Sequence, residues 1–258
     1  MIYRANYAAS VRVENETIPV IKLWYLFGGF HRGRGFGSIV IIYGGSKNEN
    51  LRMVVANSLG VRLVDLGFNV YCFDFRSNLD ASRFDEFGLY DRLEDAREVV
   101  KWILDSTRSP VSLMGVSMGG PLAVAIASEF GCKIKNLFLV APAAYTHKAM
   151  KPEVKFGPRF RKIIRKPESW HETASFKEAR KVSASTLVIK FDKDKVVPDE
   201  IPTAYFQNIG QETELGSLHV ELKSLEGPHS GTFTNSQRQK DIIRAIREFL
   251  ALPPMARD

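Results

Sequence analysis

The stretch VSLMGVSMGGPLAVAIASEF, residues 111–130, joins an apolar run typical of a buried strand to an apolar run typical of a helix. We expect the strand over Val111–Met114. The helix is expected over Pro121–Phe130, because proline is tolerated only in the first turn of a helix. Between them lies GVSMG, residues 115–119, which matches the pattern G-x-S-x-G. A serine on a sharp turn between a strand and a helix is the arrangement of a nucleophile elbow.

The two glycines of this motif fit the geometry of such a turn. The turn forces the serine into an unfavourable backbone conformation and brings the residues two before and two after it close together. Gly115 and Gly119 are small enough for this crowding. The N–H of Met118 would then lie at a helix start, where the helix dipole favours an oxyanion. We therefore expect Ser117 to be a nucleophile and Met118 to supply one oxyanion-hole donor; the alternative is an ordinary Gly- and Ser-rich turn.

Strands and helices alternate along most of the chain. The run at 38–43, SIVIIY, is apolar without alternation, which indicates a strand buried on both faces. Apolar residues at helical spacing predict helices within 51–63, 93–104 and 242–250. Further strands are expected at 11–13, 20–26, 69–75, 135–140, 186–191 and 219–222. This order predicts an α/β fold, with a mainly parallel central sheet and helices on both faces.

A nucleophilic serine needs an imidazole to take its proton, and the imidazole needs an anion to orient it. The strand at 186–191 runs into Asp192 and Asp194, and either carboxylate could serve. His229 follows the next strand in a turn-rich loop, which favours it as the base; the alternative is a solvated loop histidine. The remaining histidines precede the serine, lie in the segment 145–185 or lie within a strand: His31, His147, His171 and His219.

Together these stretches resemble the α/β-hydrolase family, from about residue 20 to residue 250. In that family a late strand ends G-x-x-D-x-x-V-P, and the similar FDKDKVVP at 191–198 selects Asp194 as the acid. The family's H-G-x loop corresponds to YGG at 43–45, which implies that Gly45 supplies the second oxyanion N–H. The family's G-x-x-H corresponds loosely to the residues ending at His229. The resemblance thus implies acyl transfer by Ser117, His229 and Asp194.

The chain departs from the family pattern at three places. Tyr43 replaces the usual histidine of the H-G-x loop, and Phe191 replaces a glycine. The family's D-x-R-G-x-G begins here as DFR at 74–76 but continues as SNL at 77–79. None of these changes removes a member of the triad.

The formal charge of +7 is concentrated in one segment. Residues 145–185 hold eleven Lys or Arg against four Glu and no Asp. The resemblance implies core regions at 1–144 and 186–258 and a lid or cap at 145–185. The lid would be a short basic helical insert whose apolar side covers the pocket while its charges face water. Alternatively, its basic surface meets an anionic lipid or substrate, or, least favoured, nucleic acid.

Several classes of function are disfavoured. Phosphate-binding loops and metal-binding motifs are missing from the sequence, so we expect no cofactor and no metal. The sequence offers no apolar stretch long enough to span a membrane and no secretory signal, and Cys72 and Cys132 read as free buried thiols of a cytoplasmic protein. We expect hydrolysis of a carboxylic ester in a small acyl substrate. The alternatives are an acyl thioesterase or acyltransferase with the same triad, and a non-catalytic binding protein.

Overall fold

The computed structural model describes residues 3–25, 36–45, 47, 51–212 and 218–252. Eight strands within these residues form one sheet in the order β1-β2-β4-β3-β5-β6-β7-β8. β1 pairs antiparallel with β2, and β2 with β4, whereas all other neighbours are parallel. The predicted mainly parallel sheet is therefore confirmed. The strands are β1 (Tyr3–Val13), β2 (Glu16–Tyr25), β3 (Ser38–Ile42), β4 (Asn69–Phe73), β5 (Val111–Val116), β6 (Ile134–Val140), β7 (Ser185–Phe191) and β8 (Val220–Leu225).

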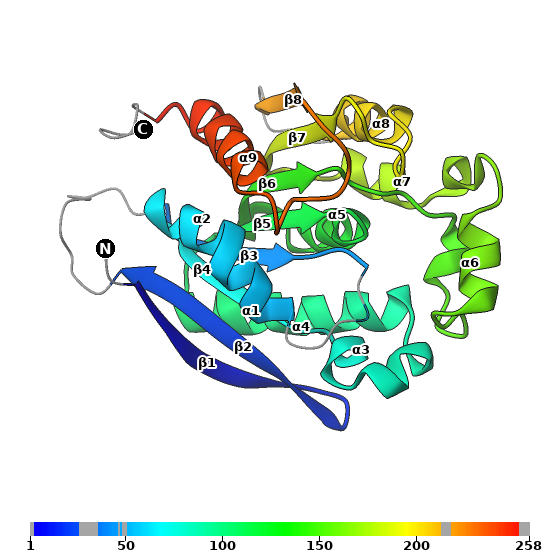
Figure 1. Ribbon diagram of the computed structural model, residues 1–258, viewed down its shortest axis with the longest axis horizontal. Helices are drawn as coiled ribbons and strands as arrows, with labels where there is room; N and C mark the ends of the chain where they lie inside the picture. The colour runs from blue at the N-terminus through cyan, green and yellow to red at the C-terminus, as the bar shows by residue number, and fades with distance from the viewer. Residues whose placement is uncertain (1–2, 26–35, 46, 48–50, 213–217, 253–258) are drawn as a thin grey trace.

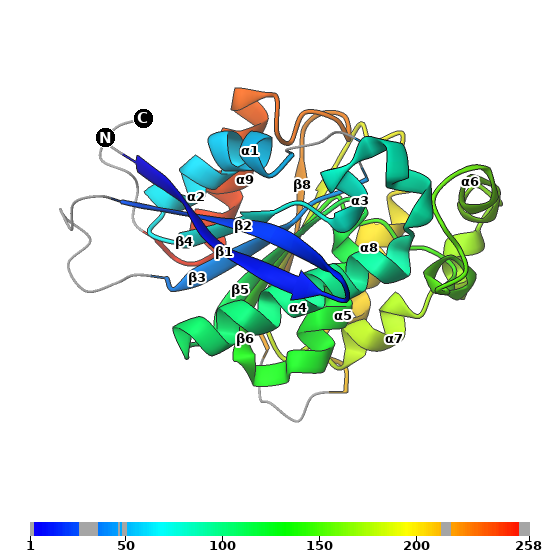
Figure 2. The same cartoon turned by 90° about the horizontal axis from the view of Figure 1, so that it is seen from below.

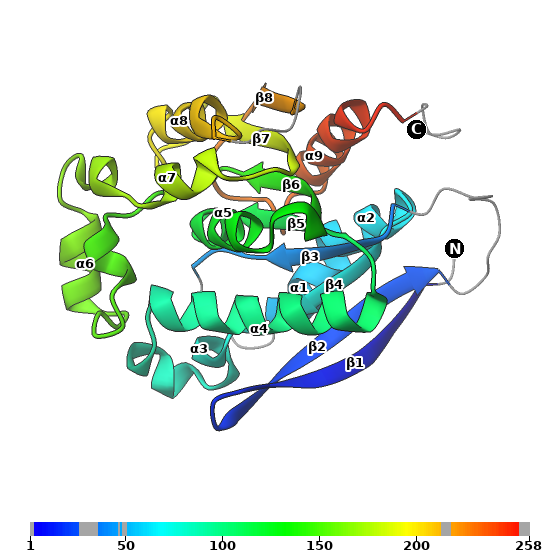
Figure 3. The same ribbon diagram turned by 180° about the vertical axis from the view of Figure 1, so that it is seen from behind.

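Helices cover both faces of this sheet (Figures 1, 2 and 3). One face carries α1 (Leu51–Val55), α2 (Val61–Asp65) and α9 (Ser236–Phe249). The other carries α4 (Leu89–Thr107), α5 (Gly119–Phe130), α7 (Ser175–Arg180) and α8 (Glu200–Asn208). The short α3 (Arg76–Leu79) and α6 (Pro158–Ile164) lie beyond the carboxyl ends of the parallel strands (Figure 1). A π-helical turn (Ala56–Gly60) joins α1 to α2, and 3-10 turns occur at Ala81–Glu86, Gly131–Lys133, His147–Met150 and Ser169–Glu172.

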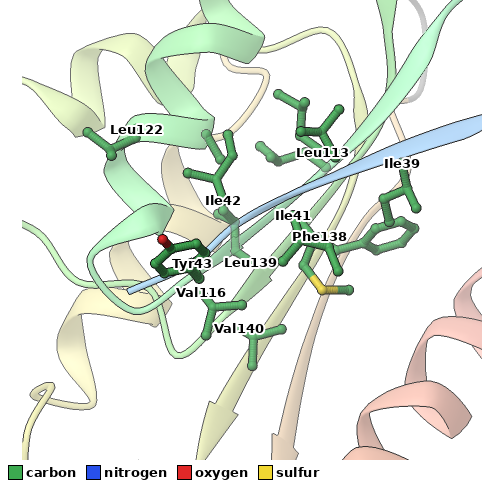
Figure 4. Close-up of a cluster of buried hydrophobic side chains, with 14 of the residues drawn as sticks. Ile39, Ile41, Ile42, Tyr43, Leu113, Val116, Leu122, Phe138, Leu139 and Val140 are labelled. Atoms are coloured by element: carbon green, nitrogen blue, oxygen red, sulfur yellow. The ribbon is translucent and has the colours of Figure 1, made fainter. Parts of the chain in front are cut away.

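The central strands are buried along their whole length. Every residue of β3 and β5 is buried, as expected for parallel strands with helices on both faces. Ile41, Leu113 and Leu139, from three neighbouring strands, lie in one apolar cluster (Figure 4). The carboxyl ends of β5, β7 and β8 reach the same edge of the sheet, because these strands are parallel. The loops that carry Ser117, Asp194 and His229 leave from that edge.

The first two strands are longer than the sequence indicates. We expected strands at 11–13 and 20–26, of which Leu26 lies outside the described residues, and the structure has a long hairpin. Its turn places Glu14 at a φ of 52°. In β1, Val11 and Val13 are buried whereas Arg12 is exposed. A strand at the sheet edge needs only this alternation, so it lacks the continuous apolar run that marks the central strands.

The two cysteines differ from each other. Both thiols are free, and Cys72 is buried in β4. The expectation that Cys132 is buried is wrong: it is exposed in the 3-10 turn Gly131–Lys133, after the last turn of α5. Burial raises the pKa of the Cys72 thiol far above its ordinary value. Cys72 therefore behaves as a small apolar side chain of the core.

Candidate active site

Ser117 lies directly after β5 and has a backbone φ of 52°. A positive φ is unfavourable for a residue that carries a Cβ, so the surrounding structure has to impose it. The serine N–H donates to the Val140 carbonyl at 2.9 Å, and the serine carbonyl accepts from the Ala143 N–H at 3.0 Å. The strand, the strained turn and the helix α5 thus follow one another as the nucleophile elbow requires.

Two glycines allow the elbow to pack against its neighbours. A Cβ on Gly119 would lie 2.0 Å from the carbonyl oxygen of Ile42 in β3. A Cβ on Gly115 would lie 2.8 Å from the carbonyl oxygen of Gly119. Both positions are closer than non-bonded atoms can approach, so neither site has room for a side chain. The crowding predicted from the motif is present on both sides of Ser117.

The structure brings together the three side chains that the sequence selected. Ser117 Oγ lies 2.8 Å from His229 Nε2, and His229 Nδ1 lies 2.7 Å from Asp194 Oδ2. The Asp194 side chain is 7% exposed and the His229 side chain 16% exposed. This relay of three hydrogen-bonded side chains, Ser117–His229–Asp194, is therefore mostly shielded, while the imidazole keeps contact with solvent. A carboxylate on Nδ1 favours the tautomer whose free Nε2 can accept the serine proton. This arrangement can generate a nucleophilic serine.

The two aspartates that follow β7 have different partners. Asp194 Oδ1 accepts the backbone N–H groups of Val196 and Val197 at 2.8 and 2.9 Å, which leaves Oδ2 for His229. Asp192 Oδ1 instead accepts the Gly227 N–H at 2.6 Å. The structure thus places Asp194 on the imidazole, as the family resemblance implies. Asp192 anchors the loop that carries His229.

Arg238 also holds the histidine loop, and the sequence analysis did not identify it. Its guanidinium lies over the Phe191 ring, with Cζ 4.3 Å from the centroid, and donates to the Pro228 carbonyl. A Cβ on Gly227 would lie 1.9 Å from Nη2 of Arg238, so the loop passes directly over the guanidinium. The aromatic ring that replaces the family's glycine at 191 therefore has a partner. The arginine lies in a helix rich in charged residues, where the sequence pattern offers no sign that it is buried.

The proposed oxyanion loop packs against the elbow. Met118 precedes the first residue of α5, so its N–H lies at the positive end of the helix dipole. A Cβ on Gly44 would lie 2.9 Å from the Ser117 Cβ, and a Cβ on Gly45 would lie 2.9 Å from the Met118 Cε. Gly44 therefore lies against Ser117, and Gly45 lies against the Met118 side chain, because neither glycine carries a side chain of its own. The loop that holds Gly45 and the elbow that holds Met118 are thus in contact.

Tyr43, which stands where the family has a histidine, is 1% exposed. Its hydroxyl donates to Asp74 Oδ1 at 3.1 Å, and its ring packs edge-on against Phe75. Burial, followed by the negative charge of Asp74, raises the pKa of Tyr43 well above its ordinary value. The phenol is therefore neutral at physiological pH. Arg52 also binds Asp74, through its backbone N–H and its guanidinium. Tyr43 thus joins the oxyanion loop to the end of β4.

The DFR sequence at 74–76 has a structural role. Arg76 Nε lies 2.6 Å from Asp95 Oδ1 on α4, and the Arg76 N–H donates to Asp95 Oδ2 at 2.9 Å. Arg76 also contacts Glu14 in the β1–β2 turn at 2.5 Å. The Arg76–Asp95 pair is almost fully buried and fixes α3 on α4, and the contact with the exposed Glu14 joins the hairpin to it.

A second apolar cluster links the segment 145–185 to the elbow. Phe156 and Phe160 pack edge-on at 5.1 Å, and Met118 and Tyr145 lie against the same cluster. The basic side chains on and after α6 point away from it. Those of Arg159, Arg161, Lys162, Arg165 and Lys166 are all exposed. The segment therefore presents apolar residues to the elbow and positive charge to the solvent.

The other described histidines have partners outside this site. His171 stacks on Trp170 at 3.7 Å, and His219 stacks on Phe249 at 4.5 Å. His147 Nδ1 lies 3.1 Å from the Glu172 carbonyl oxygen. His31 lies outside the described residues. Within those residues, no group of three or more His, Cys, Asp or Glu side chains is arranged to hold a metal ion. Across the same residues, none of the helices has the length and apolarity needed to span a bilayer.

The comparisons with known proteins agree with this fold. The model of the family described as serine aminopeptidase, S33, matches residues 39–214. This span covers the oxyanion loop, the elbow and Asp194. The chain therefore belongs to this family of α/β-hydrolases. No curated protein matches the sequence.

Solved structures share the fold at low sequence identity. A predicted CIB-like hydrolase from Thermoplasma acidophilum is 18% identical, with a TM-score of 0.62 over 97% of this chain and 98% of the other. Est1E from Butyrivibrio proteoclasticus is 14% identical, with a TM-score of 0.63 over 95% and 100%. An esterase from Pyrococcus furiosus is 17% identical, with a TM-score of 0.63 over 97% and 92%. The fold thus recurs over nearly the whole length of each protein.

Proposed function

We propose that this protein is a serine hydrolase that cleaves a carboxylic ester through an acyl-enzyme. The observation that carries the proposal is the continuous relay Ser117–His229–Asp194, with contacts of 2.8 and 2.7 Å, built on a serine with positive φ. A binding protein has no physical need for this set of contacts. The S33 family match and the fold shared with esterases support the same assignment.

The proposed reaction has two halves. In the first, Ser117 Oγ attacks the ester carbonyl while His229 Nε2 takes the hydroxyl proton. His229 then returns this proton to the leaving alcohol as the carbon–oxygen bond breaks. In the second half, His229 activates a water molecule that attacks the acyl-enzyme, and Ser117 leaves with its proton. Asp194 stabilises the imidazolium in each half, and the Gly45 and Met118 N–H groups hold the oxyanion.

The apolar cluster beside Met118 favours a substrate with a hydrophobic acyl group. Phe156, Phe160 and Tyr145 would contact the acyl chain or shield it from water. One structural neighbour is described as an esterase, and another, Est1E, has been solved with ferulic acid bound. An acyl ester of modest size fits this setting best. The two free cysteines are consistent with a reducing, cytoplasmic location.

Four other functions remain as outcomes of the test. A thioester could be cleaved, or the acyl group passed to an acceptor other than water, by the same triad. The family description also includes aminopeptidase activity. A non-catalytic binding role is the alternative of another class. The intact relay disfavours it, because a binding protein does not need the serine deprotonated.

We also propose that residues 145–185 act as a lid whose exposed basic face attracts an anionic group on the substrate or on a lipid surface. The basic face lies opposite the apolar cluster. The basic face would therefore attract the anionic group, while the apolar face would cover the site beside the elbow. The core would then comprise 1–144 and 186–258.

The first test is an assay of p-nitrophenyl esters of increasing acyl length, alongside an acyl-CoA, with the wild type and Ser117→Ala. We expect ester turnover that rises with acyl length and falls roughly 10⁴-fold or more in Ser117→Ala, as expected for removal of a triad serine. Faster cleavage of the acyl-CoA would favour the thioesterase alternative. Equal activity in the two proteins would contradict the proposal.

A further inference from the structure

Arg92, on α4, contacts both elements of the proposed oxyanion hole. Its side chain is fully buried. Nη1 donates to the Gly44 carbonyl oxygen at 3.2 Å and lies 3.6 Å from Met118 Sδ. Gly44 precedes one proposed oxyanion donor, and Met118 is the other. One guanidinium therefore touches the diglycine loop and the elbow at the same time.

The surroundings of Arg92 hold its guanidinium in one orientation. Nε donates to Ser77 Oγ at 3.0 Å, and Nη2 donates to Asn78 Oδ1 at 3.0 Å. Cζ lies 4.7 Å from the Phe75 ring centroid and 4.8 Å from that of Phe156. Rings and polar atoms together fix the plane of the guanidinium. Ser77 and Asn78 belong to the SNL sequence that replaces the family's glycine-rich continuation, so this departure provides the partners of Arg92.

The contact with the Gly44 carbonyl determines the direction of the Gly45 N–H. Both groups belong to one peptide unit, which is planar and trans, so they point in opposite directions. Two consecutive glycines have wide backbone freedom and do not hold that plane themselves. Tyr43 does not hold it either, because its hydroxyl is directed to Asp74. A donor on the carbonyl side keeps the N–H on the opposite side, away from Arg92.

We propose that Arg92 is a positioning residue that aims and polarises the Gly45 N–H of the oxyanion hole. This inference rests on the proposed serine hydrolase activity. A charge-assisted hydrogen bond to a carbonyl strengthens the hydrogen bond that the N–H of the same peptide donates. Burial lowers the pKa of the Arg92 guanidinium to about 10, so the group keeps its positive charge at neutral pH.

This role predicts a specific kinetic signature. Negative charge develops on the oxyanion only as the reaction proceeds, so a misdirected donor lowers kcat and leaves KM nearly unchanged. Complete loss of one oxyanion donor lowers kcat roughly 10²–10³-fold, and misalignment lowers it less, by roughly 10–100-fold. A residue that serves only the stability of the fold would lower the melting temperature without this split between kcat and KM.

The test compares Arg92→Met, which removes the donors, with Arg92→Lys, which keeps the charge but not the planar fork. The matched control is Arg97→Met on the same helix, because Arg97 pairs with Glu94 and Glu129 instead. Each protein is assayed with a p-nitrophenyl ester for kcat and KM. Each is also titrated with a trifluoromethyl ketone, which forms an oxyanion adduct with the serine. The melting temperature of each is recorded.

In Arg92→Met we expect kcat to fall roughly 10–100-fold, with KM within about threefold and ketone affinity reduced by the same factor as kcat. Arg92→Lys should be intermediate, and Arg97→Met unchanged. An unchanged kcat in folded Arg92→Met, or a lower kcat with unchanged ketone affinity, would overturn the inference. If Arg92→Met fails to fold, Arg92→Lys is judged instead, because it loses the planar fork: kcat and ketone affinity should fall by one common factor, with KM within about threefold, and an unchanged kcat would overturn the inference. A wild type that neither turns over nor binds the ketone would instead overturn the proposed function.

Discussion

Tyr43 and Asp74, which are 31 residues apart in the sequence, meet through a hydrogen bond of 3.1 Å between the phenol hydroxyl and Oδ1. Both residues are almost fully buried. Tyr43 directly follows β3 and leads into the diglycine loop, and Asp74 directly follows the neighbouring parallel strand β4. The bond therefore ties the base of the oxyanion loop to the carboxyl end of β4.

Replacing Tyr43 by phenylalanine tests how much this hydrogen bond contributes to the stability of the fold. Tyr43→Phe removes the hydrogen bond to Asp74 and leaves the contact between Asp74 and Arg52 in place. We expect the free energy of unfolding to fall by about 1.5–3 kcal/mol, the cost of losing a buried hydrogen bond to a charged group. Urea unfolding measures it, with Tyr90→Phe at an exposed position of α4 as the control. Equal stability of the two variants would show that the bond contributes nothing.

Arg238 offers a test of the histidine loop. Arg238→Met removes the donor to the Pro228 carbonyl and the cation over Phe191. We expect His229 to lose its fixed position and kcat to fall by roughly 10-fold or more, since small displacements of a reacting group cost up to about 100-fold. Ester hydrolysis is the measurement. Arg244→Met, at an exposed position of the same helix, should retain wild-type kcat. An equal fall of kcat in both variants would argue against a role of Arg238 in holding the loop that carries His229.

The glycine beside the nucleophile gives a steric prediction. Gly119→Ala places a methyl group where the Ile42 carbonyl oxygen lies 2.0 Å away, and that oxygen belongs to the backbone of a central strand. We expect a loss of about 3 kcal/mol or more in unfolding free energy, at the upper end of the cost of overpacking. Gly131→Ala meets no neighbour within 4 Å, so it lacks the steric part of this cost and carries only the backbone strain, about 1–3 kcal/mol. Similar costs, measured in urea, would contradict the steric account.

The basic face of the proposed lid predicts a selective effect on substrates. In a variant with Arg161, Lys162, Arg165 and Lys166 all changed to Gln, the loss of positive charge should raise KM for anionic acyl substrates. Neutral short esters should be cleaved as before, because the apolar face of the segment is untouched. The comparison of KM values at low salt is the measurement, since screening weakens such attraction. Equal changes for both kinds of substrate would refute charge-based capture.

Much of the fold follows from local patterns in the sequence. The strand expected at Val111–Met114 and the helix expected at Pro121–Phe130 lie within the observed elements, Val111–Val116 and Gly119–Phe130, because an apolar run stands on each side of the glycine-rich motif. The order of the serine, the aspartate and the histidine at successive strand ends likewise points to a single site. Parallel strands place their carboxyl ends on one edge, so the sequence order alone brings these residues near each other.

Other features depend on tertiary contacts that no local pattern reveals. Arg92 and Arg238 lie on amphipathic helices, where a charged residue reads as a surface residue, yet both are buried against aromatic rings. The alternation within β1 was too weak to predict its length, because an edge strand needs few apolar residues. Cys132 follows an apolar helix in the sequence but lies in an exposed turn after it. In each case the neighbours that decide burial come from distant parts of the chain.

Labelling with a fluorophosphonate, with the modified residue located by mass spectrometry, tests the central claim most directly. The wild type should be labelled at Ser117 alone and to completion. His229→Gln and Asp194→Asn should be labelled far more slowly, by roughly 10⁴-fold, because the serine then lacks its base or the group that orients it. Ser117→Ala should not be labelled. Labelling at another residue, or a folded wild type that stays unlabelled while the relay Ser117–His229–Asp194 is intact, would contradict the account.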